Sequence, residues 1–325
     1  MKVFVAGATG AIGKRLVPAL RDRGHEVVAM TRSPQKVTEL QAAGAEAVVA
    51  DALDQQAVAR VIHAAQPDAV IHQLTSLANV KQLRRFDREF AATNRLRTVG
   101  TANLLAAARS AGVRRFVAQS YGGWNYEPSG DALKTERDRF DPHPPRHQRE
   151  SLDAIRHLEE SVLTERQVTG VALRYGMLYG PGTNLAFDGD LADLVRARKL
   201  PIIGSGQGVW SFIHVDGAAL ASVVAMERGA AGAYNIVDND PAPVAVWLPE
   251  LARALGAKPP RHIPTWLGLL VGGEVTVSLM TRVRGISNAK ARTELRWTPR
   301  YPSWREGFRS GLGATKEPRT MSAAG

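Results

Sequence analysis

Three glycines near the start of the chain, Gly7, Gly10 and Gly13, have the spacing of a phosphate-binding turn. They stand in VFVAGATGAIGKRL, where a β-branched run ends and a helical pattern begins. Gly7 allows a tight turn, Gly10 lets backbone amides approach a pyrophosphate, and Gly13 lets the helix pack close to the sheet. A glycine triplet alone indicates only a flexible connection, but this context predicts dinucleotide binding. The other turn residues expected to contact the dinucleotide are Thr9, Ala11 and Ile12.

The ends of the second and third predicted strands bear on the choice of dinucleotide. NAD-binding units usually place an Asp or Glu after the second strand for the ribose 2′-hydroxyl, but this chain has MTRSPQK there and no carboxylate before Glu39. Arg32, with Lys36 as a second candidate, suits a 2′-phosphate, although a solvated loop arginine fits the same pattern. We therefore expect NADP(H) rather than NAD(H). Asp51, followed by Ala52, is expected to meet the adenine, to cap the next helix, or both.

Strands and helices alternate along the first half of the chain. Short β-branched or apolar runs are separated by helical patterns of ten or more residues, as in a parallel sheet covered on both faces. We predict an α/β fold, a Rossmann-type doubly wound parallel sheet with a smaller C-terminal substrate lobe. The expected parts are a Rossmann domain at 1–177 and 208–237, a lobe at 178–207 and 238–311, and a flexible tail at 312–325.

Several segments together resemble the extended short-chain dehydrogenase/reductases, the NAD-dependent epimerase/dehydratase-like family. These segments, within residues 1–310, are GATGAIG, VVADALD, VIHQL, GTANLLAAARSAGVRRFVAQS, LRYGMLYGPG and SFIHVDGAA. The resemblance implies that Leu74 and Thr75 pass near the nicotinamide ribose and that Ser120 lies by the reacting carbon. The residues it implies beside the nicotinamide are Tyr175, Gly176 and Met177. A homodimer is the family-level expectation.

The chain departs from that family at the catalytic pair. The family's Tyr-x-x-x-Lys helix carries a tyrosine that moves the proton and a lysine that holds the nicotinamide ribose, usually with a Glu one turn later. In SLDAIRHLEES, alignment on Glu160 puts Leu152 and Arg156 at the two positions. Alignment on Glu159 puts the preceding serine and isoleucine there. Neither register restores the pair, so the chain resembles the atypical members that lack the tyrosine.

A second departure precedes the fifth predicted strand. The family usually reads Asn-x-x-Gly-Thr, whereas RTVGT puts Arg97 at the asparagine position, with Asn94 one turn earlier as an alternative. Arg97 and Arg156 are both expected to contact the cofactor. Arg156 can bind ribose hydroxyls but cannot carry a proton. Its alternative role is an ion pair with Glu160 on a solvated face.

Other side chains near the expected cleft could replace the missing chemistry. Ser120 together with Tyr121, with Arg156 nearby, is the predicted catalytic set, because strand ends of this fold face the cleft. Aromatic packing under a loop is the alternative for Tyr121. The predicted substrate contacts are Trp124, Tyr126, Tyr179 and Asn184. His143 and His147 flank two prolines and lack a carboxylate–histidine set, so we expect no metal.

Composition narrows the classes of protein. The 325 residues are 44% hydrophobic and 22% charged, with no cysteine, so disulfide and thiolate chemistry is excluded. The net charge of +11 is spread among acidic residues, which favours an anionic small molecule over nucleic acid. The apolar stretch 263–280 contains Glu274 and two glycines, so a membrane span is not expected. The N-terminus lacks a signal-peptide pattern, and a cytoplasmic location is the simplest interpretation.

The predicted function is hydride exchange between NADP(H) and a carbonyl or alkene of a small, apolar metabolite. Hydride transfer depends on proximity more than on a strong acid, although a lost proton donor costs roughly 10²–10⁴-fold in rate unless it is replaced. Two alternatives remain at this stage. One is an epimerase, dehydratase or lyase that retains its cofactor, and the other is a non-enzymatic NADP(H) sensor that docks a partner through residues 263–280.

Overall fold

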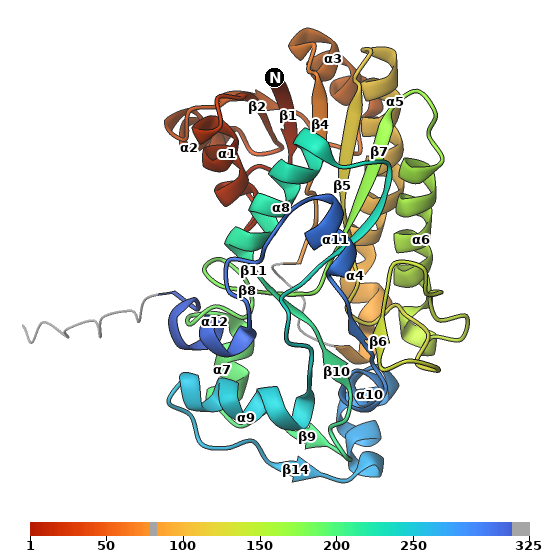
Figure 1. The fold of residues 1–325 in the computed structure, drawn as a ribbon, viewed down its shortest axis with the longest axis vertical. Helices are drawn as coiled ribbons and strands as arrows, with labels where there is room; N and C mark the ends of the chain where they lie inside the picture. Colours follow the sequence, from red (N-terminus) through yellow and green to blue (C-terminus); the bar gives the residue numbers. More distant parts are fainter. Residues whose placement is uncertain (78–82, 314–325) are drawn as a thin grey trace, which may run out of the picture.

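A seven-stranded parallel sheet organises the chain (Figure 1). The computed structural model describes residues 1–77 and 83–313. The strand order is β3-β2-β1-β4-β5-β7-β12. The chain adds strands toward one edge from β1 to β3 and toward the other edge from β4 onward, so β1 and β4 flank the switch point where sheets of this kind bind ligands. The strands are β1 (Lys2–Ala6), β2 (Glu26–Thr31), β3 (Glu46–Val49), β4 (Ala69–His72), β5 (Arg115–Tyr121), β7 (Thr169–Tyr175) and β12 (Gly232–Ile236). This topology confirms the predicted fold class.

Helices cover both faces of the sheet, because the strands are apolar on both sides. One face packs on α1 (Gly13–Asp22), α2 (Val37–Ala42) and α8 (Val215–Arg228). The other face packs on α3 (Gln55–Ala65), α5 (Thr101–Ser110) and α6 (Arg149–Leu163). A π-helical turn at Leu96–Gly100 joins α4 (Phe86–Arg95) to α5, and α4 lies against α6. The carboxyl ends of the strands point toward the second lobe (Figure 1).

That second lobe has a core of its own, with Trp247 and Trp304 fully buried. Its helices are α7 (Asp190–Arg196), α9 (Val244–Ala254), α10 (Thr265–Thr281) and α12 (Trp304–Ser310). Its short strand pairs are β8 (Met177–Tyr179) with β11 (Phe212–His214), β9 (Ile202–Ile203) with β14 (His262–Ile263), β10 (Val209–Trp210) with β13 (Ala242–Pro243), and β6 (Leu133–Lys134) with β15 (Gly285–Ile286). None of the helices in the described ranges is long and apolar enough to cross a membrane.

Two segments are placed differently from the predicted lobe (238–311) and tail (312–325). Helix α11 (Ala289–Glu294) returns to the sheet, and Trp297 packs in the α1–α8 core, where its Nε1 donates to the Gly217 carbonyl at 3.1 Å. Leu312 is buried, and its carbonyl accepts from the Phe187 amide at 2.8 Å. The start of the predicted flexible tail is therefore packed, and the tail from 314 to 325 lies outside the described residues.

Candidate functional site

The turn between β1 and α1 has the backbone geometry that the glycines predicted. Gly7 adopts φ +94°, and a Cβ there would lie 2.7 Å from backbone atoms of Gln73. A Cβ at Gly13 would lie 2.2 Å from the Gly7 carbonyl oxygen. Gly10 is exposed at the mouth of the turn, and its amide donates to the Gly7 carbonyl at 3.1 Å. A cradle that a Cβ would fill, opening on the N-terminus of α1, fits the pyrophosphate of a dinucleotide.

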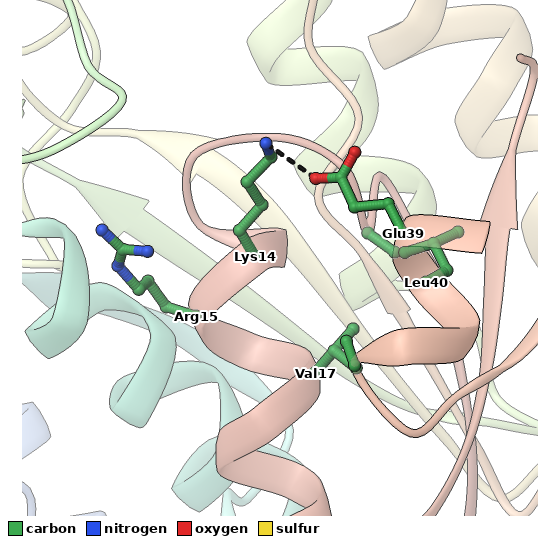
Figure 2. Close-up of a pocket in the computed structure, with 7 residues that line it drawn as sticks. Lys14, Arg15, Val17, Glu39 and Leu40 are labelled. Atoms are coloured by element: carbon green, nitrogen blue, oxygen red, sulfur yellow. Dashed lines mark ion pairs between the residues drawn. The ribbon is translucent and has the colours of Figure 1, made fainter. Parts of the chain in front are cut away.

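Cations gather beside this cradle. Figure 2 shows a pocket between α1 and α2 in which Lys14 points toward Glu39. Lys14 and Lys36 both pair with Glu39, at 2.8 and 2.9 Å, and hydrogen bonds from the two lysines lower the pKa of this carboxyl to about 2. Arg32 is exposed and has no ion-pair partner in the part of the chain that the structure describes. Of the two cations predicted after β2, Arg32 is therefore the one left uncommitted.

Asp51 and its neighbours follow β3. The Asp51 carboxylate is exposed and accepts from the Leu53 amide at 2.9 Å. Helix α3 is capped by Asp54, whose side chain accepts from the Ala57 amide. The alternative role of Asp51 as that cap is therefore wrong, while its carboxylate remains open at the sheet edge. Ala52 is buried.

On helix α6 it is Glu159, and not Glu160, that faces the interior of the protein. The Glu159 carboxylate is 5% exposed, accepts from Ser120 Oγ at 2.6 Å, and pairs with Arg174 Nη2 at 2.6 Å. Because this carboxylate stabilises the cation, it raises the pKa of Arg174 despite the burial of the guanidinium. Glu160 faces solvent. Alignment on this buried glutamate, the second of the two registers, puts Ser151 and Ile155 at the tyrosine and lysine positions, and both are buried.

Two residues of the predicted catalytic set are consequently committed elsewhere. Arg156 lies on the outer side of α6, where it donates to Asp153 Oδ1 at 2.9 Å and to the Asp141 carbonyl at 2.7 Å. Its placement at the lysine position rested on Glu160, so this prediction is corrected. Ser120 is buried and donates its hydroxyl to Glu159. The Ser120 side chain at the end of β5 therefore points toward α6.

A chain of polar contacts surrounds the tyrosine position. Ser151 Oγ donates to Asp87 Oδ1 at 2.7 Å, and Asn94 Nδ2 donates to Ser151 Oγ at 3.0 Å. Arg97, 7% exposed on the π-helical turn, donates to Asn94 Oδ1 at 3.5 Å. Burial lowers the pKa of Arg97 to about 10, and a smaller effect from Tyr121 opposes this shift. Arg97 remains a cation at neutral pH.

Tyr121 stands at the end of β5 beside an aromatic cluster of Phe86, Phe90 and Trp124. Its ring centre lies 6.1 Å from that of Trp124, and Trp124 meets Phe86 edge-on at 5.2 Å. Phe86 and Phe90 stack at 4.1 Å. Burial raises the pKa of Tyr121 to about 12, so its phenol is protonated at neutral pH. The hydroxyl lies over Gly123, where a Cβ would approach within 2.3 Å.

Of the other predicted substrate contacts, two are buried and one is exposed. Tyr126 is 4% exposed, donates to Asn235 Oδ1 at 2.7 Å and accepts from Arg174 at 2.8 Å. Tyr179 is fully buried against Phe212, His214 and Phe308. Both tyrosines are therefore parts of the core in this structure, which corrects their predicted role. Asn184 is exposed at the start of the lobe.

The residues implied beside the nicotinamide lie at the carboxyl edge, with different exposure. Leu74 and Thr75 follow β4 and are half-buried, as is Met177. Tyr175 is fully buried, and its hydroxyl contacts Ser222 at 2.7 Å and Gln73 at 3.2 Å on the α8 side. A Cβ at Gly176 would lie 2.4 Å from the Ser211 carbonyl oxygen. The Tyr175 side chain therefore supports the sheet and offers no surface to a ligand.

Two acidic residues outside the predicted site join segments that are far apart in the sequence. Glu136 is half-buried, and its carboxylate accepts from the Asn235 amide at 2.7 Å. Asp87, in the first turn of α4, accepts from the Glu150 and Ser151 amides at the N-terminus of α6. An acidic residue stabilises the N-terminus of a helix through the helix dipole. The sequence, however, does not indicate that α4 lies beside the N-terminus of α6. His214 caps α8, where its side chain accepts from the Asp216 amide.

The described residues contain no group of three or more His, Asp and Glu side chains arranged to hold a metal ion. His143 and His147 are both exposed.

Comparison with known proteins gives consistent matches. The family model "NAD dependent epimerase/dehydratase family" matches residues 3–237. A 3-diazoavenalumate denitrifying reductase from a Streptomyces species is 46% identical over 311 residues, covering 95% of this chain and 99% of the relative. A 2-alkyl-3-oxoalkanoate reductase from Stenotrophomonas maltophilia is 29% identical over 270 residues, covering 79% of this chain and 76% of the relative.

Solved structures show the same fold. A UDP-glucose 4-epimerase from Thermotoga maritima, with UDP-glucose, superposes with a TM-score of 0.75 at 22% identity, covering 96% of this chain and 97% of that one. The human epimerase family protein SDR39U1, with NADPH, gives a TM-score of 0.74 at 21% identity, covering 96% and 99%. At these identities the likeness concerns the fold alone.

Proposed function

The chain belongs to the NAD dependent epimerase/dehydratase family as an NAD(P)-dependent reductase, and we propose that it uses NADP(H) to reduce a group that needs no strong proton donor. The first candidate is the diazo group of a small aromatic molecule. The relative with 46% identity along nearly its whole length is named for a diazo compound, which supports this substrate class.

The observation that carries the proposal is the content of α6. In the alignment on the buried Glu159, Ser151 and Ile155 replace the proton-moving tyrosine and its lysine, and both are buried. Reduction of a ketone develops negative charge on oxygen, and loss of a general acid there costs roughly 10²–10⁴-fold in rate. A diazonium nitrogen is cationic, so its capture of a hydride gives a neutral product without a proton. An electrophile of this kind tolerates the loss of the pair.

The proposed reaction balances without a further reactant. When bound, NADPH supplies a hydride. The terminal nitrogen of the C–N⁺≡N group gains this hydride in a new N–H bond while one N–N bond pair moves to the internal nitrogen, which gives a neutral diazene. The C–N bond then breaks, dinitrogen leaves, and the hydrogen ends on the ring carbon. The substrate is reduced by two electrons overall, and a C–H bond replaces the C–N bond on the ring.

The chain's own residues bind and orient the reactants. The cradle of Gly7, Gly10 and Gly13 holds the pyrophosphate, and Arg32 takes the 2′-phosphate through charge-assisted hydrogen bonds. The aromatic cluster beside Tyr121 gives an aromatic substrate a surface on which to pack. Proximity achieved in this way accounts for much of the barrier reduction that a hydride transfer requires.

The cofactor part is tested by fluorescence titration of NADPH and NADH. Arg32→Ala is compared with Arg166→Ala, which removes an exposed arginine before β7, at the opposite edge of the sheet. We expect wild type and Arg166→Ala to prefer NADPH, and Arg32→Ala to lose about 10- to 100-fold of that preference. Equal affinity of wild type for both dinucleotides would overturn the NADP(H) proposal.

The reaction is tested with two substrates that share one skeleton, 3-diazonio-4-hydroxybenzoate and 3-acetyl-4-hydroxybenzoate. NADPH oxidation is followed by absorbance, and the products are identified by mass spectrometry. We expect 4-hydroxybenzoate with one NADPH oxidised per diazo group lost, and slower turnover of the ketone by about 10² or more. Faster reduction of the ketone would overturn the diazo assignment.

Carbonyl reduction is the second candidate, because Tyr121 keeps its proton at neutral pH and stands beside the aromatic cluster. In that case the Tyr121 phenol donates the proton that the developing alkoxide needs. The same two-substrate experiment decides between the candidates. A retained-cofactor cycle would instead convert substrate with no net NADPH consumption.

A further inference from the structure

Arg97 is a buried cation without a protein anion to balance it. It is 7% exposed, and its guanidinium donates a hydrogen bond to Oδ1 of the neutral Asn94 side chain at 3.5 Å. No carboxylate pairs with it among residues 1–77 and 83–313. The nearby carboxylate of Asp87 is already satisfied by Ser151 and two backbone amides. Burial of an unpaired charge is costly, so such a group usually has a ligand as its partner.

The position of Arg97 is that of the reaction centre. Its partner Asn94 bonds to Ser151 Oγ, and the alignment on Glu159 puts Ser151 at the position of the family's catalytic tyrosine. The positive charge of Arg97 also acts on Tyr121 at the end of β5. Hydrogen bonds also connect Arg97 through Asn94 and Ser151 to Asp87, which directly follows Phe86, so the cation and the aromatic surface belong to one connected region.

We propose that Arg97 binds a carboxylate of the substrate, and that the substrate is an aromatic acid whose ring packs on Tyr121, Trp124 and Phe86. A guanidinium presents paired donors that match the two oxygens of a carboxylate. This inference rests on the proposed reductase function, because it takes the same aromatic cluster as the substrate site. It adds the charge and the class of the molecule.

The test uses binding, so that it does not depend on turnover. The probes are 4-hydroxycinnamate and its uncharged amide, titrated calorimetrically into protein saturated with NADP⁺. The variants are Arg97→Gln, Arg97→Lys and the matched control Arg95→Gln, which removes an exposed arginine two residues earlier. Affinity for NADP⁺ and the thermal melting of each variant are measured alongside.

We expect wild type and Arg95→Gln to bind the acid about 10- to 100-fold more tightly than the amide. Arg97→Gln should bind both equally, Arg97→Lys should fall between, and affinity for NADP⁺ should change less than about threefold. If Arg97→Gln does not fold, Arg97→Lys and the acid-to-amide ratio of wild type decide.

Equal binding of acid and amide by wild type would overturn the inference. So would a large loss of NADP⁺ affinity in Arg97→Gln, because Arg97 would then serve the cofactor. Absence of diazo reduction together with a clear preference for the acid would overturn the proposed reaction and leave the carboxylate site standing.

Discussion

The two halves of the carboxyl edge of the sheet are built by different means. At β1 and β2 the dinucleotide cradle is a matter of backbone, with Gly7 and Gly13 in places where a Cβ does not fit. At β5, β7 and β12 the edge is held by buried polar side chains, among them Glu159, Arg174 and Asp238. The first half therefore depends on backbone conformation and the absence of side chains. The second half depends on contacts between buried charged and polar side chains.

This difference shows why the cradle is kept while the catalytic pair is absent. A backbone turn binds phosphate with amides that any residue supplies, so its geometry leaves little to vary. A reaction centre depends on two side chains whose replacement leaves the backbone in place. Substitutions at the two halves should therefore fail in different ways.

The largest effect is expected from Glu159→Ala, which leaves the buried guanidinium of Arg174 without its anion. The free energy of unfolding should fall by about 3–5 kcal/mol in urea denaturation. Glu160→Ala, one position on and exposed, is the matched control and should change it by less than about 0.5 kcal/mol. Equal losses in the two variants would mean that α6 is not held through Glu159.

A pH-dependent effect is expected from Asp238→Asn. Burial, with a smaller contribution from the charge of Asp240, raises the pKa of Asp238 from 3.8 to about 8. Between these values the unfolded chain loses a proton that the folded chain keeps, so the stability of wild type falls as pH rises from about 4 to 8. Asparagine cannot ionise, so the variant should lack this fall.

At pH 7 the gain in Asp238→Asn has an upper bound of about 4 kcal/mol. Thermal melting at pH 5 and pH 8 measures the difference between the two proteins. Parallel pH profiles for wild type and variant would show that Asp238 ionises normally in the fold.

In the cradle, Gly13→Ala and Gly10→Ala separate folding from binding. The Gly13 methyl would meet the Gly7 carbonyl, so we expect lower stability and loss of dinucleotide affinity by about 100-fold or more. At Gly10 the closest atom is 3.4 Å away, so the fold should persist while affinity falls about tenfold. Circular dichroism and NADPH titration measure both properties. Unchanged affinity in both variants would place the dinucleotide elsewhere.

The smallest effect is expected from Ser151→Ala. The variant loses the hydrogen bond from Ser151 Oγ to Asp87, which should cost about 1 kcal/mol of stability. Turnover of the diazo substrate should change less than about threefold, because Ser151 does not replace the tyrosine in our proposal. A fall in kcat of about 100-fold at unchanged stability would instead assign it a proton-transfer role.

The sequence was sufficient to predict the sheet, the cradle and the family. These features depend on hydrophobic periodicity and on glycines whose function is steric, and both are visible along the chain. The matches to two reductases also confirm the predicted oxidoreductase class.

The register of α6 was not predictable in the same way. Glu159 and Glu160 are neighbours of identical type, and only packing shows which one meets Ser120 and Arg174. Tyr126 was misplaced for a related reason, because burial depends on long-range contacts such as that with Asn235. The groups that surround Arg97 are Asn94 on α4 and Tyr121 on β5, and Tyr121 is far from Arg97 in the sequence.

The pairing of Glu159 with Arg174 has a consequence for the history of such proteins. Glu159 ties α6 to the sheet from one turn beyond Ile155 and two turns beyond Ser151. The helix therefore does not need a tyrosine or lysine at those positions to stay docked. Loss of that pair therefore leaves the helix docked, so a scaffold of this kind can change its reaction during evolution while it keeps its fold.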